Sequence, residues 1–375
     1  MENNIIKILE KLENNGYQAY LVGGFVRDYL LGKTSYDVDI ATDALPKDIH
    51  SIFNSTKSNY GSVNMQIHKY NIDITTFRKD LNYVNRKPNT VIYIDNLEDD
   101  LKRRDFTINA ICMNKNGKII DPIGGCNDLN NRVIKMIGNI SVKLEEDPLR
   151  IMRAIRFASV LDFDIEEDLY KKIKEYSYLV NRLSKERIKS EMEKILLSKN
   201  FKKALDIMED TNISRVLGIE YSHINYVDDL LGMWAQLKVS NIPFTNVEKG
   251  NIIKITEVLN LGKIDNFVLY NYGLYVSTIS GKILNINPKK VSGMYNKLPI
   301  KSRDDISITS ADIIKMFGSG KVVGEVYKDL EKEILEKRLI NKRDKIIEYL
   351  KKRKWELCLK IIKNLWQKQY LLKKP

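Results

Sequence analysis

The sequence predicts an α+β head followed by an all-helical remainder. Up to about residue 140, short runs rich in β-branched and aromatic residues alternate with helix signals. From about residue 144, apolar residues recur with helical spacing instead. The chain has 375 residues, 43% of them hydrophobic and 30% charged, which is enough for two or more globular domains.

The elements of the head follow from local patterns. Residues 1–16 predict an amphipathic helix that ends at Gly16, and not a cleavable signal. Alternating or continuous apolar runs predict strands at 18–24, 37–42, 62–70, 71–77, 90–95 and 108–114.

The remainder is expected to consist of helices separated by turn-forming residues. Helical periodicity covers 143–161, 166–180, 184–198 and 201–210. A later helix is expected to be capped near Thr309 or Ser310, with Asp312 in its first turn. Turn formers mark the expected boundaries, at Pro122 with Gly124 and Gly125, at Asn200, and over 285–305.

The composition excludes several classes of protein. No apolar run approaches the ~18 residues that a membrane span needs, so we expect a cytoplasmic protein without membrane contact. The scattered cysteines and histidines favour neither a disulfide framework nor a zinc site, and a metal would be hard and bound by oxygen. These residues are Cys112, Cys126, Cys358, His50, His68 and His223.

The net charge of +13 has two interpretations. Lysines and arginines are concentrated in residues 337–375. A basic balance favours a polyanionic partner such as nucleic acid, but a proteome rich in lysine and asparagine would produce the same balance. Charge alone leaves both interpretations open.

A pair of carboxylates is the first candidate for a catalytic site. Asp37 and Asp39 alternate with apolar residues on a predicted strand, so both carboxylates face the same side. Such a pair can hold two Mg²⁺ ions about 3.5–4 Å apart, as nucleotidyl transfer requires. An Asp-x-Asp pair alone is more often a surface turn, but the residues before it suit a phosphate, namely Gly23, Gly24 and Arg27.

Other polar residues have a functional and a purely structural interpretation. Asp73 lies on another predicted strand and is either a third acidic group or a carboxylate in solvent. The turn at 101–111 carries Arg103, Arg104, Asp105 and Asn109, which suit phosphates and ribose or belong to a solvated helix start. The segment FGSGKVVGE at 317–325 contains Gly-Ser-Gly-Lys but lacks the spacing of a phosphate loop, so a helix stop is favoured.

The segment 145–158 opens a helix with one acidic residue and a row of arginines. Asp147 precedes Pro148, and Arg150, Arg153 and Arg156 follow on one face. Taken alone, Asp147 would be an N-cap and the arginines would lie at the surface.

Several motifs together resemble one superfamily. In order, they are GGFVRDYLLG with DVDIAT, RRDFTINA, IGGCNDLNNRVIKMIG, EDPLRIMRAIRFA and RIKSEMEKIL, which span roughly residues 20–197. They resemble the class II tRNA nucleotidyltransferase and bacterial poly(A) polymerase superfamily. The resemblance implies a head with a mixed β-sheet flanked by helices (1–140), a helical neck that selects the nucleotide (141–200), a helical body (201–285) and a helical tail that binds tRNA (286–375).

The resemblance also implies roles for individual residues. Asp37 and Asp39 would be catalytic and would ligate two Mg²⁺ ions. Gly23, Gly24 and Arg27 would contact the triphosphate, and Arg104, Asp105 and Asn109 would serve ribose and phosphates. Asp147 and Arg150, with Arg153 and Arg156 nearby, would select the incoming nucleotide.

Base chemistry supports that last role independently. Cytosine and adenine each present an amine donor beside a ring-nitrogen acceptor, whereas uracil and guanine present an acceptor beside an N–H. A carboxylate beside a guanidinium therefore matches C and A and leaves U and G unpaired.

The implied activity is addition of CCA to tRNA from CTP and ATP. The segment 77–91 resembles the flexible loop of enzymes that add A, with Arg78, Asp80, Tyr83 and Arg86 as its polar members. After CCA addition, the next activity in rank is addition of A alone. A poly(A) polymerase and a non-catalytic RNA-binding protein follow. The expected partners are tRNA, CTP and ATP, and no protein partner is evident.

Overall fold

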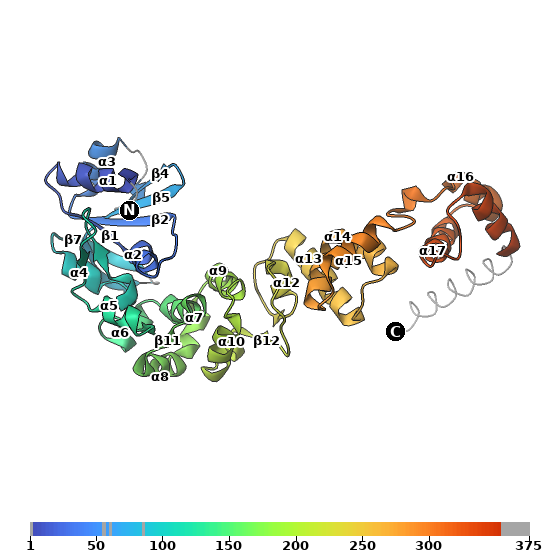
Figure 1. Ribbon diagram of the computed structural model, residues 1–375. Helices are drawn as coiled ribbons and strands as arrows, with labels where there is room; N and C mark the ends of the chain where they lie inside the picture. Colours follow the sequence, from blue (N-terminus) through green and yellow to red (C-terminus); the bar gives the residue numbers. More distant parts are fainter. Residues whose placement is uncertain (1–2, 55–57, 60–61, 85–86, 354–375) are drawn as a thin grey trace. The chain divides into compact units, whose positions relative to one another are not determined.

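The structure is a computed structural model that describes residues 3–54, 58–59, 62–84 and 87–353 (Figure 1). The chain forms two compact units. The first comprises Met1–Tyr221 and Lys238–Pro243, and the second comprises Ser222–Leu237 and Phe244–Pro375. None of the helices in the described part of the chain has the length and hydropathy that a bilayer crossing requires.

A seven-stranded mixed sheet forms the centre of the head. Its strand order is β3-β4-β5-β2-β1-β8-β9, in which β2 and β5 are parallel and the other neighbours are antiparallel. The strands are β1 (Ala19–Val22), β2 (Asp37–Thr42), β3 (Ser58–Asn59), β4 (Ser62–Ile67), β5 (Tyr70–Thr76), β8 (Cys112–Met113) and β9 (Ile119–Ile120). The mixed sheet expected for the head is confirmed.

The helices of the head are α1 (Asn3–Glu13), α2 (Gly23–Leu30), α3 (Pro46–Phe53), α4 (Leu97–Lys102) and α5 (Gly125–Asn130). The predicted amphipathic helix is confirmed, because α1 buries Ile5, Ile8, Leu9 and Leu12 on one face. The strand expected at 108–114 is shorter than predicted. A 3₁₀ turn over Thr107–Asn109 replaces its beginning.

The segment expected to be a loop at 77–91 contains paired strands. Strand β6 (Arg78–Val84) pairs antiparallel with β7 (Lys87–Tyr93) in a separate two-stranded sheet. The strand expected at 90–95 overlaps β7.

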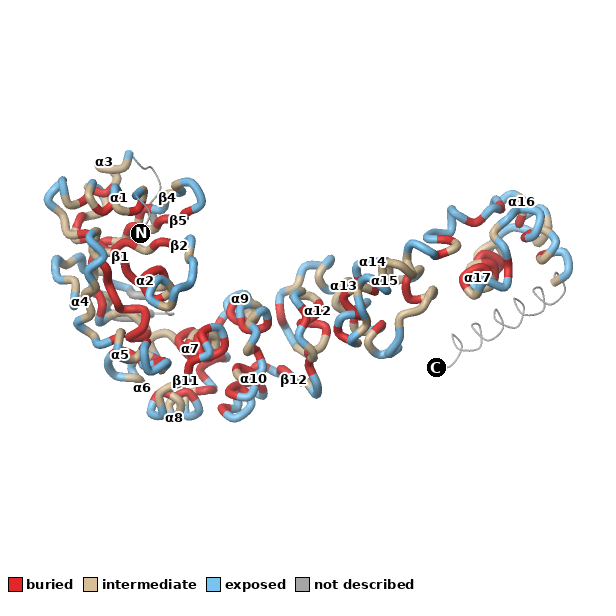
Figure 2. Tube along the Cα trace, in the orientation of Figure 1, coloured by how far each residue is buried: buried red, intermediate tan, exposed pale blue. Residues whose placement is uncertain are grey.

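Helices follow the head within the first unit. They are α6 (Ile140–Glu146), α7 (Leu149–Leu161), α8 (Glu167–Glu175), α9 (Lys185–Leu196), α10 (Phe201–Asp210) and α11 (Ile213–Leu217). The short strands β10 (Val133–Ile134) and β11 (Asp164–Ile165) pair with each other, as do β12 (Ile219–Glu220) and β13 (Lys238–Val239). Helix α7 packs against α9 and α10 and is buried along most of its length (red in Figure 2). It is therefore a fixed support for the side chains it carries.

The described part of the second unit is helical apart from its connections. Its helices are α12 (Leu230–Trp234), α13 (Asn246–Leu261), α14 (Asn266–Ile283), α15 (Pro288–Asn296), α16 (Ser310–Phe317) and α17 (Lys321–Leu335), and residues 343–353 are also helical. The stretch 285–305, expected to be a boundary of turn-forming residues, also contains a helix, because α15 begins in it at Pro288. The predicted cap is confirmed: Thr309 and Asp312 form a capping box on α16, and Gly318 ends that helix.

Candidate active site

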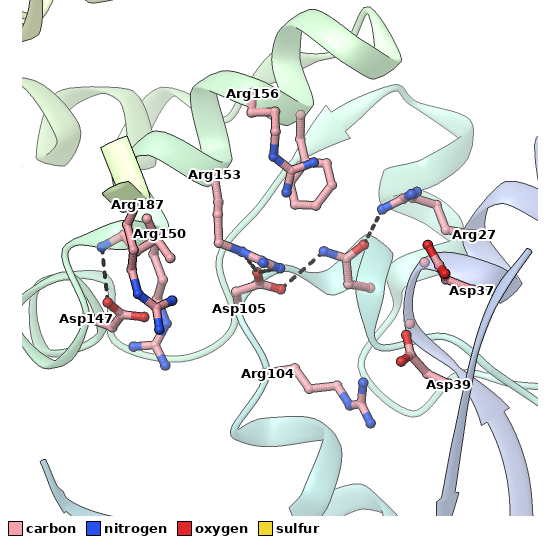
Figure 3. A pocket seen from close by; sticks show the side chains of 15 residues that line it. Arg27, Asp37, Asp39, Arg104, Asp105, Asp147, Arg150, Arg153, Arg156 and Arg187 are labelled. Atoms are coloured by element: carbon pink, nitrogen blue, oxygen red, sulfur yellow. Dashed lines mark hydrogen bonds and ion pairs between the residues drawn. The ribbon is translucent and has the colours of Figure 1, made fainter. Parts of the chain in front are cut away.

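One cavity of about 640 Å³ collects the predicted catalytic and nucleotide-binding residues (Figure 3). It is lined by Gly23, Gly24, Arg27, Asp37, Asp39, Arg104, Asp105, Asn109, Asp147, Arg150, Arg153 and Arg156. Leu149, Phe157 and Arg187 complete the lining. The cavity thus joins residues of the sheet and its loops to residues of α7 and α9.

The two carboxylates lie as their alternation predicted. Val38 and Ile40 of β2 are 1% exposed, while Asp37 and Asp39 face the cavity. The amide of Asn71 donates to the Asp37 carboxylate at 3.0 Å. Burial raises the pKa of Asp39, Arg104 opposes this rise, and the negative charge of Asp37 adds to it. A cation between the two carboxylates would remove this repulsion.

Gly23 allows the backbone to approach Asp39. It has a φ of +71° and begins α2 directly after β1. A Cβ at this position would lie 2.7 Å from Oδ2 of Asp39, so a side chain here would displace the carboxylate. The N-terminal amides of α2 therefore lie next to the carboxylate pair, where they suit an anion.

A chain of hydrogen bonds crosses the cavity wall (Figure 3). Arg153 donates to Oδ2 of Asp105 at 2.7 Å, and Asn109 donates to Oδ1 at 3.1 Å. Arg27 donates to Oδ1 of Asn109 at 2.7 Å and pairs with Asp28 at 2.8 Å. Asp105 and Asn109 thus hold arginines from α7 and α2, rather than the neighbouring Arg103 and Arg104.

The surroundings of Asp105 favour the ionised form of its carboxyl group. Burial alone would raise the pKa of its carboxyl, but Arg153, Asn109 and the backbone N–H of Phe106 outweigh burial and hold the pKa below its ordinary value. The charge of Arg153 is therefore balanced by the protein itself.

Asp100 anchors the two adjacent arginines. Its side chain is 1% exposed, and it accepts hydrogen bonds from Arg103 at 2.8 Å and from Arg104 at 3.2 Å. Its Oδ1 also accepts the backbone N–H of Arg78, where the hairpin begins. The Nε of Arg104 is buried without a hydrogen-bond partner among the described residues.

Asp147 and Arg150 lie next to each other where α6 meets α7. Oδ1 of Asp147 accepts the backbone N–H of Leu149 at 3.1 Å, but the N-cap role expected for Asp147 is wrong, because Pro148 is the N-cap of α7 and Asp147 ends α6. Arg150 is 7% exposed and donates to the carbonyl of Lys143 at 2.6 Å and to Glu146 at 3.2 Å. Both side chains are held in place before any ligand arrives.

Phe157 lies among three guanidinium groups. The ring centroid is 4.0 Å from Arg156, 5.1 Å from Arg27 and 5.5 Å from Arg153. Arg156 also pairs with Glu191 of α9 at 2.5 Å. The ring further makes an edge contact with Phe106, with the centroids 5.7 Å apart.

The remaining predicted residues lie outside this cavity. Asp73 of β5 is paired in register with Asp39 but lines two smaller cavities beside the sheet, and burial and Asp39 raise its pKa. Arg78 and Asp80 lie on β6 and form an ion pair at 3.1 Å. Arg86 and the side chain of Tyr83 lie outside the described residues.

Three residues of the site were not predicted from the sequence, namely Arg187, Phe157 and Glu191. Arg187 and Glu191 lie in the motif RIKSEMEKIL, four residues apart and hence on one face of α9. Phe157 follows Arg156 within the arginine row. All three residues therefore belong to motifs that the sequence shows. Only the contact of α9 with α7 reveals that they lie at the cavity.

Three family profiles match successive parts of the chain. Residues 19–135 match the poly A polymerase head domain. Residues 162–220 match the "Probable RNA and SrmB-binding site of polymerase A". Residues 224–350 match domain 2 of tRNA nucleotidyltransferases.

Whole-length relatives support the same relationship. A CCA-adding enzyme of Ligilactobacillus salivarius is 36% identical over 92% of this chain and 95% of the relative. A CCA-adding enzyme of Staphylococcus haemolyticus is 33% identical over 93% and 97%. The crystal structure of the Bacillus stearothermophilus CCA-adding enzyme in complex with CTP aligns with a TM-score of 0.77 at 28% identity, over 94% of this chain and 98% of that one. The chain therefore belongs to the family of CCA-adding enzymes, which are nucleotidyltransferases.

Proposed function

We propose that this chain adds CCA to the 3′ end of tRNA from CTP and ATP, without a nucleic-acid template and with release of pyrophosphate. One observation carries the proposal: a carboxylate pair suited to nucleotidyl transfer and an Asp/Arg pair suited to C and A line the same cavity. Relatives named as CCA-adding enzymes over almost their whole length support the assignment.

The triphosphate would bind at the carboxylate end of the cavity. Gly23 and Gly24 contribute backbone amides at the N-terminus of α2, and Arg27 is held beside them by Asp28 and Asn109. Arg104 adds a guanidinium whose Nε has no partner among the described residues. Both guanidinium groups are fixed before binding, so little side-chain entropy is lost when phosphate arrives.

The residues present fit a divalent metal, as is typical of this family. Asp37 and Asp39 offer oxygen ligands on one face, and their mutual repulsion favours a cation. Within the described residues there is no cluster of three or more metal-binding side chains, so the nucleotide phosphates and water would complete the coordination. Two Mg²⁺ ions held there would supply Lewis-acid assistance to the attacking 3′-hydroxyl and the departing pyrophosphate.

The base would be selected by Asp147 and Arg150. The carboxylate of Asp147 accepts from the exocyclic amine of C or A, and the guanidinium of Arg150 donates to the ring nitrogen. With U or G, acceptor would face acceptor and donor would face donor. Because both side chains are fixed by α6 and α7, the protein itself would act as the template.

We infer the remaining organisation from the same proposal. The parts are a head over 1–140, a neck over 141–200, a body over 201–285 and a tail over 286–375 that contacts tRNA, largely through phosphates. In the segment 77–91, Arg78, Asp80, Tyr83 and Arg86 would assist the change from C to A. A protein acting on tRNA with CTP and ATP would work in the cytoplasm.

The proposal is tested with purified protein, Mg²⁺ and three tRNA transcripts that end before CCA, after C and after CC. CTP and ATP are supplied separately and together, and product lengths are measured. Addition that completes CCA and then stops is the expected result. Addition of A only to the transcript ending in CC would identify an A-adding enzyme, long A tails would identify a poly(A) polymerase, and no product would indicate a binding protein; each of these would overturn the proposal.

A further inference from the structure

Arg187 differs from the other arginines that line the cavity. Five of the six are paired with acids, as Arg27 with Asp28, Arg104 with Asp100, Arg150 with Glu146, Arg153 with Asp105 and Arg156 with Glu191. Within the described part of the chain, the side chain of Arg187 is exposed and makes no hydrogen bond or ion pair. Its charge is therefore not balanced by a contact with any residue that the structure describes.

The fold explains why the Arg187 side chain has no partner among residues 3–54, 58–59, 62–84 and 87–353. The adjacent Ile188 is fully buried and anchors α9, so Arg187 is carried on a fixed helix. The acid one turn further on, Glu191, already pairs with Arg156 at 2.5 Å and with Lys194 at 3.5 Å. Arg187 also lies in the first turn of α9, where the helix backbone adds partial positive charge.

The position of Arg187 limits which ligand it can contact. It lies beside Arg150 and Asp147, whereas Asp37 and Asp39 lie across the cavity (Figure 3). A nucleotide bound as proposed would carry its negative charges at the carboxylate pair and present an uncharged base to Asp147. No anionic group of CTP or ATP would then lie at Arg187.

We propose that Arg187 binds a phosphodiester of the single-stranded 3′ end of tRNA as that strand enters the cavity. The inference rests on the proposed function, because RNA is the other substrate and each of its linkages carries a negative charge. A guanidinium suits this group, since it can donate two parallel hydrogen bonds to phosphate oxygens. Arg187 would thus position the strand whose hydroxyl reacts and would leave nucleotide binding to the paired arginines.

The test is tRNA binding without nucleotide, measured as Kd against salt concentration. The RNA is a transcript ending after CC, compared with the same transcript lacking its single-stranded 3′ end. We expect Arg187→Ala to weaken binding of the first RNA about three- to tenfold and to reduce the slope of log Kd against log salt by about 0.7, the value for one single-strand phosphate. Arg187→Lys should retain most of the affinity, and the truncated RNA should bind wild type and variant equally.

Arg182 provides a matched control. It is an exposed arginine of the preceding 3₁₀ helix, Ser177–Arg182, and it does not line the cavity. Arg182→Ala should leave the Kd and the salt slope of both RNAs unchanged.

Three results would overturn the inference. These are an unchanged salt slope in Arg187→Ala, an equal loss of affinity with the truncated RNA, and a raised KM for CTP with unaltered tRNA binding. The last result would show that Arg187 contacts the nucleotide and not the tRNA. Because binding is measured without nucleotide, a wild-type protein that fails to add CCA would reject the proposed activity and leave the binding result intact.

Discussion

The active-site cavity and the second unit hold their charged residues in different ways. The paired arginines of the cavity expose only 8–34% of their side chains, whereas the paired lysines and arginines described in the second unit expose 38–73%. The second unit is instead centred on an apolar cluster that includes Val326, Leu330 and Ile334. One region buries charge and the other buries hydrocarbon.

Buried ion pairs and buried apolar side chains contribute differently to function and to stability. Burying an ion pair gives little net stability, because desolvation offsets the attraction, but the pair fixes the direction of both groups. Apolar burial stabilises by about 25 cal/mol per Å² and fixes no charge. The cavity is therefore organised for an anionic substrate, and the second unit derives its stability from packing.

The largest effect should follow from removing one charge of the carboxylate pair. Asp39→Asn keeps the shape of the side chain but removes a negative ligand, so we expect incorporation of CMP to fall by roughly a thousandfold or more. The measurement is single-turnover incorporation with saturating tRNA and CTP, alongside the tRNA Kd. A rate within tenfold of wild type would show that Asp39 is not a catalytic residue.

In the second unit, the largest effect should follow from opening the apolar core. Leu330 is fully buried in the core cluster, and Leu330→Ala should lower the free energy of unfolding by about 3–4 kcal/mol. Urea unfolding monitored by circular dichroism measures this loss. Incorporation by the folded variant at low temperature should be nearly normal, and a loss below 1 kcal/mol would contradict the assignment of this core.

Breaking a buried charge pair of the cavity should cost somewhat less. Asp105→Asn leaves Arg153 without its carboxylate, and because Arg153 is a third exposed we expect a loss of about 2–3 kcal/mol in the free energy of unfolding at pH 7. The folded pKa of Asp105 is lowered, so its contribution is present above the ordinary carboxyl pKa and is lost as pH falls through the folded value. The difference between wild type and variant should therefore shrink in acid.

The control for that experiment is an exposed pair. Glu167 and Lys171 pair at 2.6 Å on the surface of α8, with 82% and 65% of their side chains exposed. Glu167→Gln should leave the free energy of unfolding nearly unchanged, because solvent screens the exposed pair. Equal losses in the two variants would remove the contrast between buried and exposed charge.

The smallest effect concerns the choice of base. Asp147→Ala removes the acceptor for the amine of C and A, so we expect the preference for CTP over UTP, as a ratio of kcat/KM values, to fall about tenfold or more. Asp147 also accepts a hydrogen bond from the backbone of Leu149 at the start of α7, so Asn139→Ala, which removes the N-cap hydrogen bond of α6, is the matched control and should leave the preference unchanged. An unaltered preference in Asp147→Ala would reject the role of this residue as template.

Local features of this fold could be predicted from the sequence. The alternation around Asp37 and Asp39, the apolar face of α1 and the cap at Thr309 each depend on residues within one or two turns of one another. These features are set by short-range interactions, so they can be predicted from the sequence without knowledge of the fold.

The pairing of charges inside the cavity could not be predicted in the same way. Arg153 and Asp105 are 48 residues apart, and Arg27 and Asn109 are 82 apart, so their contacts depend on how α7 and α2 pack. A single sequence shows which arginines are present but not which of them are already paired. That distinction is what sets Arg187 apart.

The ring of Phe157 has a consequence for the electric field of the cavity. An additional carboxylate would also hold Arg27, Arg153 and Arg156 together, but it would repel a triphosphate and compete for a divalent cation. The negative face of an aromatic ring attracts guanidinium groups without carrying a net charge. The ring thus keeps three guanidinium groups close together without adding a fourth carboxylate to Asp28, Asp105 and Glu191, which already pair with them.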